Sequence, residues 1–389
     1  MLSGRPKILA LATKGTGTNE EDRLRTLMSA LDVEFVRFDK SKKRKSAVEF
    51  LKTLWHERPD LVVMEGTGIA GGVPVLLARI LLGTRFVVSS GDAVAPFVAA
   101  IRPILGPAFA IYERMLCRLS SGFIGWTPYL AGRALTLGAP CAMTAAGWGP
   151  SSDPAHRAEA RARLRGRLGI DDETIVFGLL GSLVWNRRLG YCYGSELVRA
   201  ILQMTPSRRV AVVVVGGGCG LDRLRAMAAD RLGKDIFLLG EVPGSQVADH
   251  LPAFDVACLP QSVDGVGSFR YTTKLSEYLA AGLPVIIGRI PMAYDLDDGW
   301  LWRLAGRTPW DEQFIQQLSR LMARLDRTQI AEKQRAIPVA MHEFDRDRQV
   351  RRVTEFVRDI LGIAGEIPAR DGAPEQNEAP ALDPAAASL

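Results

Sequence analysis

Short apolar runs rich in β-branched residues alternate with helical segments along most of this chain, and many of the runs end in glycine-rich turns. This alternation is typical of parallel βαβ units. It occurs in two successive cycles, which span residues 7–126 and 175–287. Because each cycle has enough apolar strands to bury a sheet of its own, we expect two similar α/β domains.

The domain boundaries follow from these two cycles. We expect residues 1–150 to form an N-terminal domain, residues 151–172 a linker and helix, and residues 173–335 a C-terminal domain. Residues 336–364 contain a last helix. Residues 365–389 are rich in Pro and Ala and have no apolar period, which predicts a disordered tail.

The composition excludes several classes of protein. A hydrophobic share of 47% suits a globular chain and excludes a wholly disordered one. No stretch has the roughly 20 uninterrupted apolar residues of a membrane span, and the N-terminal apolar run is too short for a secretion signal, so we expect a cytoplasmic protein. The 5 cysteines and 4 histidines show no metal-ligand spacing, so no metal site is expected.

The most informative segment reads Tyr271-Thr-Thr-Lys274-Leu-Ser-Glu277-Tyr-Leu-Ala-Ala-Gly282-Leu-Pro284-Val. On a helix, Lys274 and Glu277 lie on one face. A carboxylate there can accept hydrogen bonds from the two hydroxyls of a nucleotide ribose, and a lysine near the positive start of the helix suits a diphosphate. The alternative is a surface ion pair between the two side chains, worth roughly 0.3 kcal/mol.

This segment resembles the K-L-x-E-Y-x-A-x-G-x-P-V motif of GT-B glycosyltransferases, especially those of family 4. Three further segments look like the same family in the same order, namely the strand-to-glycine turn at 213–218, the L-G-x-V loop at 237–243 and the A-D-V-x-x-L-P strand at 254–260. The resemblance implies a GT-B fold, in which two Rossmann-like domains face each other across a cleft. It also implies that the last helix packs back on the N-terminal domain.

The resemblance further implies a function. The enzyme would move a sugar from a nucleotide diphosphate sugar to a hydroxyl of a glycan or a lipid-linked intermediate, without a metal or another cofactor. The N-terminal domain would bind the acceptor and the C-terminal domain the donor. In similar enzymes the residue that matches Glu277 binds the donor ribose, and Val242 would contact the donor base through its backbone. Lys274 and the glycine turn at Gly217 complete the set of donor-binding residues that the resemblance implies.

The turn from Gly181 to Arg188 lies where family members show G-R-x-x-x-x-K-G, whose basic residues neutralise the donor diphosphate. Ser182 replaces the Arg, while Arg187 falls at the Lys position with Arg188 beside it. A forked guanidinium can still grip phosphate with two hydrogen bonds and stabilise the leaving diphosphate, which would make Arg187 catalytic. The alternative is a pair of arginines on an exposed loop.

A second departure concerns the reaction course. Retaining members of the family often carry a Glu eight residues before the ribose-binding one, and Phe269 stands at that position. Asp264 and Arg270 lie nearby, and the glycine-rich loop around Ser268 can direct backbone N–H groups at the donor. No side chain inherits the role of the missing Glu, so retention is favoured over inversion by the resemblance alone.

On the N-terminal side, ligands are expected where the parallel strands end. Gly15 and Gly17 follow the first strand and would pass close to the donor diphosphate from the opposite domain. Asp92 follows the fourth strand and would act as general base in an inverting reaction, drawing a proton from the acceptor hydroxyl. Glu65 is the competing base, and both carboxylates have helix capping or turn hydrogen bonding as an alternative role.

Positive charge is concentrated in the N-terminal half, where residues 1–150 hold 19 Lys and Arg against 12 Asp and Glu. The basic run at 40–45 is either a solvated loop before a helix or a contact with anionic lipid. The apolar stretch at 97–118, broken by Pro103 and Pro107, either lies in a membrane interface or forms a buried helix pair beside the cleft. Peripheral contact with the inner membrane face therefore stays open, whereas nucleic-acid binding is excluded because the basic run has no interleaved aromatic residues.

Two rival functions remain. One is a GT-B enzyme that is not a transferase, such as a nucleotide-sugar 2-epimerase, which needs acid and base groups around the sugar. The other is a catalytically degenerate partner subunit, which the departures at Ser182 and Phe269 would suit.

Overall fold

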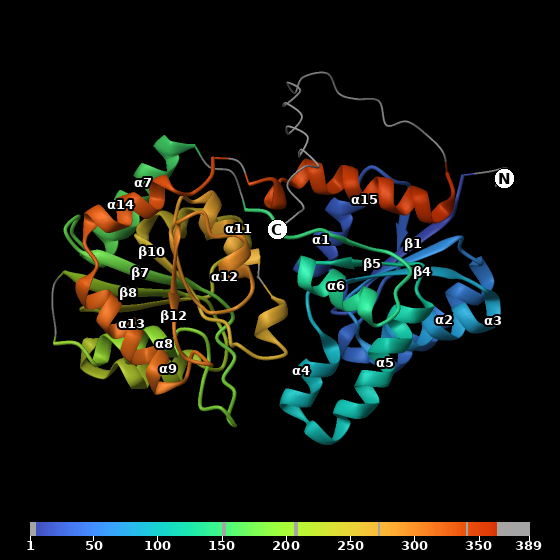
Figure 1. Ribbon diagram of the computed structural model, residues 1–389, viewed down its shortest axis with the longest axis horizontal. Helices are drawn as coiled ribbons and strands as arrows, with labels where there is room; N and C mark the ends of the chain where they lie inside the picture. Colours follow the sequence, from blue (N-terminus) through green and yellow to red (C-terminus); the bar gives the residue numbers. More distant parts are fainter. Residues whose placement is uncertain (1–4, 150–152, 206–208, 271–272, 340, 364–389) are drawn as a thin grey trace, which may run out of the picture.

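The computed structural model describes residues 5–149, 153–205, 209–270, 273–339 and 341–363. Two parallel six-stranded sheets lie side by side, each covered by helices (Figure 1). The predicted two-domain α/β architecture is therefore confirmed. The tail that the sequence predicts at 365–389 lies outside the described residues.

The N-terminal sheet has the strand order β2-β1-β3-β4-β5-β6, and all of its neighbours are parallel. Its strands are β1 (Ile8–Ala12), β2 (Val33–Phe35), β3 (Leu61–Glu65), β4 (Arg85–Ser90), β5 (Gly122–Gly125) and β6 (Ala142–Thr144). Its helices are α1 (Asn19–Leu27), α2 (Lys43–Glu57), α3 (Ile69–Leu82), α4 (Val94–Ile101), α5 (Gly106–Leu119) and α6 (Pro128–Thr136), with short 3-10 turns η1 (Lys40–Lys42) and η2 (Pro103–Leu105).

The C-terminal sheet has the order β12-β11-β10-β7-β8-β9 and is also parallel throughout. Its strands are β7 (Ile175–Leu180), β8 (Val210–Val215), β9 (Ile236–Gly240), β10 (Val256–Leu259), β11 (Val285–Gly288) and β12 (Leu301–Leu304). The helices that follow the linker are α7 (Pro154–Leu168), α8 (Ser195–Leu202), α9 (Leu221–Ala228), α10 (Val247–His250), α11 (Thr273–Ala280), α12 (Met292–Asp295), α13 (Glu312–Arg324) and α14 (Arg327–Arg335). The 3-10 turns are η3 (Ala229–Arg231), η4 (Gly244–Gln246), η5 (Leu251–Ala253), η6 (Gly267–Phe269) and η7 (His342–Phe344).

Strand β8 shows why these segments form the buried centre of a sheet. All six of its residues are buried, and five of them are valines. Val212 and Val214 belong to the apolar core on one face, while Val213 and Val215 belong to the core on the other. β-branched side chains favour strands, and a sheet covered on both faces needs no polar alternation.

Asp255, in the strand segment that resembles the family motif, has a structural role. Its carboxylate accepts hydrogen bonds from Arg161 of α7 and Arg327 of α14, each at 2.7 Å, from buried Arg165, and from the backbone N–H of Val176. Burial raises the pKa of Asp255, but the arginines outweigh it and the net pKa lies below the usual value. Through these bonds the carboxylate joins α7 and α14 to the start of the central strand β10.

The last helix, α15 (Arg346–Leu361), crosses back and lies over the N-terminal domain beside α1 (Figure 1). Val353, Val357 and Leu361 are buried in the same core as Leu24 of α1. The guanidinium of Arg85 in β4 donates to the last turn of this helix at 2.8 Å. The chain therefore passes between the two sheets twice.

The basic run at 40–45 does not form the loop that one of the two interpretations assumed. Asp39 accepts a hydrogen bond from the backbone N–H of Ser41 at 2.8 Å and begins η1, which continues directly into α2. The cationic side chains of the run are all exposed. Three of them thus lie in the first turn of a helix, where positive charge is unfavourable because of the helix dipole.

Candidate active site

Three loops converge where β7, β8 and β9 end. The backbone N–H of Leu183 donates to the carbonyl of Gly217 at 2.8 Å, and that of Gly216 donates to Gly240 at 2.8 Å. Gly216 has φ +151°, and a Cβ added to it would lie 1.7 Å from the carbonyl oxygen of Gly181. Only glycine fits there, so the glycine turn lets the three loops close into one surface at the carboxyl edge of the sheet.

Glu277 lies in α11 beside this surface. Its Oε2 atom is buried and has no hydrogen-bond partner among the described residues. Burial raises the pKa of Glu277 to about 7, and the nearby positive charge of Lys274 opposes that rise. A buried carboxylate oxygen without a partner is rare in folded proteins, and it indicates a ligand that donates hydrogen bonds.

Lys274 precedes Glu277 by three residues and lies in the first turn of α11. Its Cε is 3.4 Å from the position of a Cβ built on Gly181, and its Nζ is 5.6 Å from the centre of the Tyr193 ring. Burial lowers the pKa of Lys274, Glu277 opposes this, and the positive charge of Arg270 adds to the lowering. The amine therefore lies against the loop after β7 in surroundings that an anion would improve.

The other residues predicted to contact the donor divide into two groups. Ser182 is exposed, and Gly217 and half-buried Val242 lie in the loops that make up the same surface. Arg187 and Arg188 instead lie on the exposed tip of a hairpin closed by Asn186 and Tyr191. Neither guanidinium has an ion-pair partner in the described part of the chain, so the structure shows no preformed clamp made by these arginines.

The N-terminal carboxyl edge contains a buried ion pair that the sequence did not predict. Arg23 of α1 donates from Nη1 to Glu65 Oε2 at 2.8 Å, and both side chains are buried. Glu65 also accepts hydrogen bonds from Ser89 at 2.7 Å and from the Trp126 indole at 3.0 Å. Both carboxylate oxygens are thus engaged, so Glu65 holds the strand ends together and is not the competing general base. Burial lowers the pKa of Arg23, and Glu65 opposes that effect.

Asp92 remains the accessible carboxylate at this edge, with 39% of its side chain exposed. Its backbone is fixed by Ser90, whose hydroxyl bonds to both the N–H and the carbonyl of Asp92. Its Oδ1 accepts a hydrogen bond at 2.7 Å from Nε of Arg270, which belongs to the other domain. Asp92 therefore has a hydrogen-bond partner across the cleft.

Gly15 and Gly17 lie in the loop after β1, as predicted. Gly15 is buried, and the backbone N–H of Gly17 donates to the carboxylate of Glu21 at 2.5 Å. A groove of about 610 Å³ lies beside this loop and ends at the basic run. It is lined by Lys14, Gly15, Thr16, Thr18, Glu21, Arg25, Phe35, Arg37, Phe38, Asp39, Lys40 and Ser41.

The same two-domain arrangement occurs in solved structures. HepE of Anabaena, in a crystal structure with UDP and glucose, superposes with a TM-score of 0.64 at 17% identity, over 91% of this chain and 100% of that one. Sucrose-phosphate synthase of Thermosynechococcus elongatus gives 0.67 at 13% identity, over 92% and 100%. WaaG, a glycosyltransferase involved in lipopolysaccharide biosynthesis, gives 0.62 at 14% identity, over 89% and 99%. A search of curated protein sequences finds no match.

Residues 174–324 match the model of the family described as glycosyl transferases group 1. The matched region contains all six strands of the C-terminal sheet and the surface around Lys274 and Glu277. The chain has the GT-B fold, and its C-terminal domain matches a glycosyltransferase family. The fold that the motifs implied is thereby confirmed.

A segment of the chain crosses between the two domains just after β10. We call residues 264–270 the strap. Asp264 Oδ1 accepts hydrogen bonds from the backbone N–H groups of Val266 and Gly267, at 2.8 and 2.9 Å, which shape η6. Phe269 then packs against the apolar core of the N-terminal domain, and its carbonyl accepts a hydrogen bond from Thr127 at 2.6 Å. The strap is thus anchored on the opposite domain by both a side chain and its backbone.

Ser268 lies within the strap, and its backbone N–H donates to the carbonyl of Asp264 at 3.1 Å. This position of Phe269 also explains the second departure from the family pattern. The side chain does not replace a catalytic carboxylate but joins the two domains, and the guanidinium of Arg133 lies 5.3 Å from the centre of its ring. The backbone around Ser268 is therefore fixed, whereas no described contact engages its hydroxyl.

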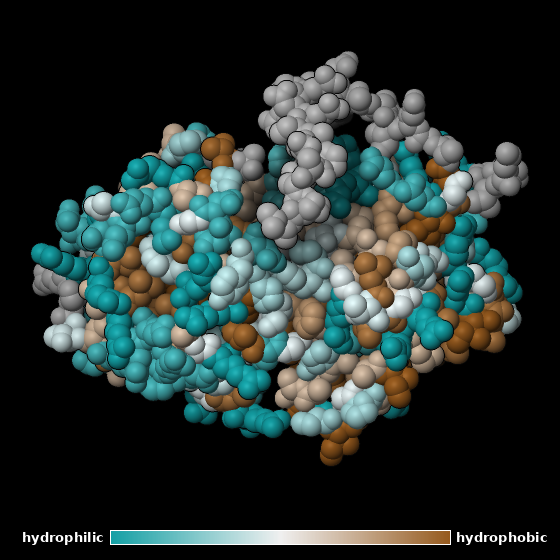
Figure 2. Space-filling model, in the orientation of Figure 1, coloured by the Kyte–Doolittle hydropathy of each residue, from teal (hydrophilic) through white to brown (hydrophobic). Residues whose placement is uncertain are grey.

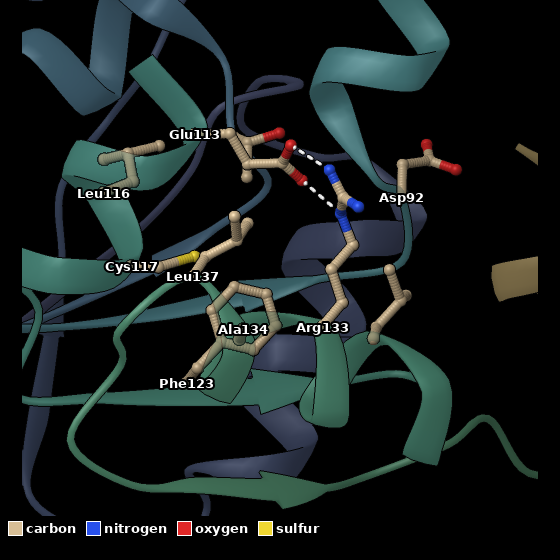
Figure 3. A pocket seen from close by; sticks show the side chains of 10 residues that line it. Asp92, Glu113, Leu116, Cys117, Phe123, Arg133, Ala134 and Leu137 are labelled. Carbon is tan, nitrogen blue, oxygen red and sulfur yellow. Dashed lines mark hydrogen bonds and ion pairs between the residues drawn. The ribbon is translucent and has the colours of Figure 1, made fainter. Parts of the chain in front are cut away.

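Arg133 also lines a small cavity of the N-terminal domain, between α5, α6 and the loop after β4 (Figure 3). Its guanidinium donates two hydrogen bonds to Glu113, at 3.1 and 2.7 Å, while the carboxylate of Asp92 points away from it. The cavity measures about 10 Å³, so it holds at most a water molecule. A sugar does not fit into this cavity.

No three His, Cys, Asp or Glu side chains gather into a candidate metal site within the described ranges. Likewise, no helix in those ranges combines the length and the apolarity that a membrane span requires.

Proposed function

We propose that the nucleotide diphosphate sugar binds at the carboxyl edge of the C-terminal sheet, with its ribose on Glu277 and its diphosphate on Lys274. The observation that carries this assignment is the buried Oε2 of Glu277, which accepts no hydrogen bond from the described residues, beside Lys274, which makes no salt bridge with them. Leaving such an oxygen unsatisfied costs about 1–3 kcal/mol, which two vicinal hydroxyls would recover. The HepE structure was solved with UDP and glucose, which supports a donor of this class.

The rest of the donor site follows from the same surface. Ser182 and Gly217 would line the phosphates, Val242 would contact the base through its backbone, and Ser268 would face the sugar from the strap. Arg187 and Arg188 would swing in from the exposed hairpin, with Arg187 stabilising the leaving diphosphate in the transition state. Because lysine and arginine supply the positive charge, we infer that the donor needs no metal ion.

The acceptor side of the proposal rests on the N-terminal edge. The groove beside Gly15 has the size of a ligand site, and its loop also carries Gly17, which would approach the donor diphosphate. The acceptor would be a hydroxyl of a glycan or of a lipid-linked intermediate. Retention is favoured by the family resemblance; in the inverting alternative Asp92 would remove the acceptor proton.

The N-terminal domain also carries an exposed apolar surface that supports a membrane-bound acceptor. Figure 2 shows apolar residues at the lower edge of this domain, where α4 and α5 lie in Figure 1. We call apolar face the exposed apolar side chains of α4, η2 and α5 together with those of α3, which packs on α5. They are Ile69, Val73, Leu77, Ile80, Leu81, Phe97, Ile101, Ile104, Leu105, Ile111 and Met115.

Exposed cations accompany the apolar face. Arg102, Arg114 and Arg118 lie within or beside its helices, and the basic run begins the neighbouring α2. Exposed apolar residues flanked by cations suit the interface of an anionic bilayer. We infer that the enzyme works in the cytoplasm, in peripheral contact with the inner membrane face.

The donor assignment is tested by thermal unfolding with UDP, GDP, ADP, CMP and dTDP. A nucleotide at about 100 times its Kd stabilises the folded protein by about 2.7 kcal/mol, a measurable rise in Tm. We expect one nucleotide to stabilise the wild type and to have little effect on Glu277→Ala. Glu159→Ala, an exposed glutamate of α7, is the matched control and should keep the full rise.

The result also separates the two rival functions. If no nucleotide raises the Tm of the wild type, the donor assignment is wrong. If a nucleotide binds but its sugar donor is neither transferred nor consumed, the protein is a degenerate subunit. Conversion of the donor without any acceptor would identify a GT-B enzyme of another reaction class.

A further inference from the structure

Arg270 ends the strap and lies between the two halves of the site. Its Nε donates to Asp92 Oδ1 at 2.7 Å, its Nη2 contacts the same oxygen, and only 19% of the side chain is exposed. The guanidinium lies 5.7 Å from the centre of the Phe97 ring in α4. Both donors to Asp92 thus meet one carboxylate oxygen across the interface of the domains.

The same side chain acts on the donor side. Arg270 comes shortly before α11, and its positive charge contributes to the lowered pKa of Lys274. Lys274 itself has no ion-pair partner in the described ranges. Asp92 forms a salt bridge with Arg270, whereas Lys274 has only the nearby charge of Glu277, whose carboxyl group is itself kept partly protonated by burial. An anion that binds between Arg270 and Lys274 would therefore be stabilised.

The sequence supplies a reason for this arrangement. Ser182 stands where related enzymes have the arginine of the diphosphate clamp, and Arg187 lies on an exposed hairpin. Among the described residues of the C-terminal domain, Arg270 is therefore the arginine placed closest in the chain to Lys274, at the end of the strap and just before α11.

We propose that Arg270 couples the donor and acceptor halves of the site: without donor it holds the carboxylate of Asp92, and with a nucleoside diphosphate bound it turns to the diphosphate and releases Asp92 toward the sugar substrates. The proposal rests on the donor site proposed above. It requires only the side chain to move, because Phe269 and Asp264 fix the backbone of the strap.

The coupling predicts effects of opposite sign on binding. Arg270→Gln removes a cation from the diphosphate, so its affinity for the nucleoside diphosphate should fall about 10- to 100-fold, the range expected when one hydrogen bond to a charged group is lost. Asp92→Asn frees Arg270 from its competing partner, so the affinity of this variant should rise. The affinity for the matching nucleoside monophosphate, which lacks the terminal phosphate, should stay within about twofold in both variants.

Titration calorimetry of the full chain, with the nucleotide that the thermal unfolding screen selects, measures these affinities. Arg270→Lys keeps the charge and should recover part of the loss, whereas the double variant should bind as Arg270→Gln does. Arg225→Gln, which removes an exposed Arg–Asp pair on α9, is the matched control and should bind as the wild type does.

Two results would overturn the coupling. One is weaker diphosphate binding by Asp92→Asn, which would make the ion pair a simple support of the closed domains. The other is an equal loss of diphosphate and monophosphate affinity in Arg270→Gln. If the wild type binds no nucleotide at all, the donor site itself is wrong and the coupling falls with it; if the wild type binds and Asp92→Asn does not bind more tightly, only the coupling fails.

Discussion

Two carboxyl groups of the C-terminal domain, Glu196 and Glu277, lie in surroundings that favour their protonated forms. Glu196 is fully buried and accepts hydrogen bonds from the backbone N–H of Gly194 at 3.2 and 3.1 Å. Burial nevertheless raises its pKa to about 7, the value that burial also gives Glu277. The folded protein therefore keeps protons that the unfolded chain releases from about pH 4.5 upward.

The pH dependence of stability follows from that difference. Between about pH 4.5 and 7 the folded state binds more protons, so the free energy of unfolding should fall as the pH rises and level off above about 7. For Glu196→Gln we expect a shallower fall and a gain of at most about 3 kcal/mol at pH 8, because an isosteric amide has no charge to bury. Urea unfolding at several pH values measures this, with the exposed Glu159→Gln as control. A variant profile parallel to that of the wild type would contradict it.

The residues of the site differ in whether their spacing in the sequence reveals their neighbours. Lys274 and Glu277 were predicted because helical spacing alone puts them on one face. By contrast, nothing in the sequence distinguishes buried Arg23 from exposed Arg25 two residues later. The burial of Arg23 depends on Glu65, which lies 42 residues away in the chain, and spacing within one element carries no information about such a pair.

At the scale of elements, the turn after β8 can lie against the loop after β7 because Gly216 has no side chain. Gly216→Ala would bring a Cβ to within 1.7 Å of a backbone oxygen at a positive φ, so the loops after β7 and β8 would have to separate. We expect a loss of about 2 kcal/mol or more in stability, together with weaker nucleotide binding. Gly166→Ala in α7 is the matched control, because no atom lies near its added Cβ and alanine favours helices by about 1 kcal/mol. Equal effects of the two substitutions on the Tm would contradict this account.

The elements that the sequence predicted best are the central buried strands. Strands β7 and β10 are apolar runs bounded by turns, and both lie inside the second cycle that the sequence predicts. The edge strands β6 and β12 lie outside the two cycles, because they have only three and four residues with mixed patterns. Helix α3 begins at Ile69 and contains Pro74 in its interior, although proline is common at the first turn of a helix.

The environment of some elements depends on tertiary packing, which local sequence rules do not describe. Helix α6 begins with Pro128 after a capping Thr127, a start signal that is visible in the sequence. The apolar stretch at 97–118 is neither a buried helix pair nor one continuous helix; α4 and α5 meet at η2, whose Ile104 is 93% exposed. Only the tertiary arrangement shows that this apolar connection faces solvent.

At the scale of the whole molecule, the apolar face and the nearby cations give the N-terminal domain a surface suited to a membrane interface. Ile104→Asp should weaken binding to vesicles that contain anionic phospholipid about tenfold, because a side chain that would enter the interface becomes charged. Co-sedimentation at low and high salt measures binding, and binding should weaken as the salt concentration rises. Val339→Asp, a fully exposed valine outside this face, is the control. Equal binding to neutral and anionic vesicles would contradict the proposed membrane contact.

The return of α15 to the N-terminal domain has a consequence for biosynthesis. Val353, Val357 and Leu361 complete the core that also contains Ile8 and Leu24, although about 330 residues separate the two groups in the chain. A nascent chain emerges from the ribosome N-terminus first, and its domains usually fold in that order. Here the C-terminal sheet can close as soon as its own strands have emerged, while one face of the earlier sheet stays uncovered until α15 has emerged as well. The domain that is synthesised first is the last to be completed.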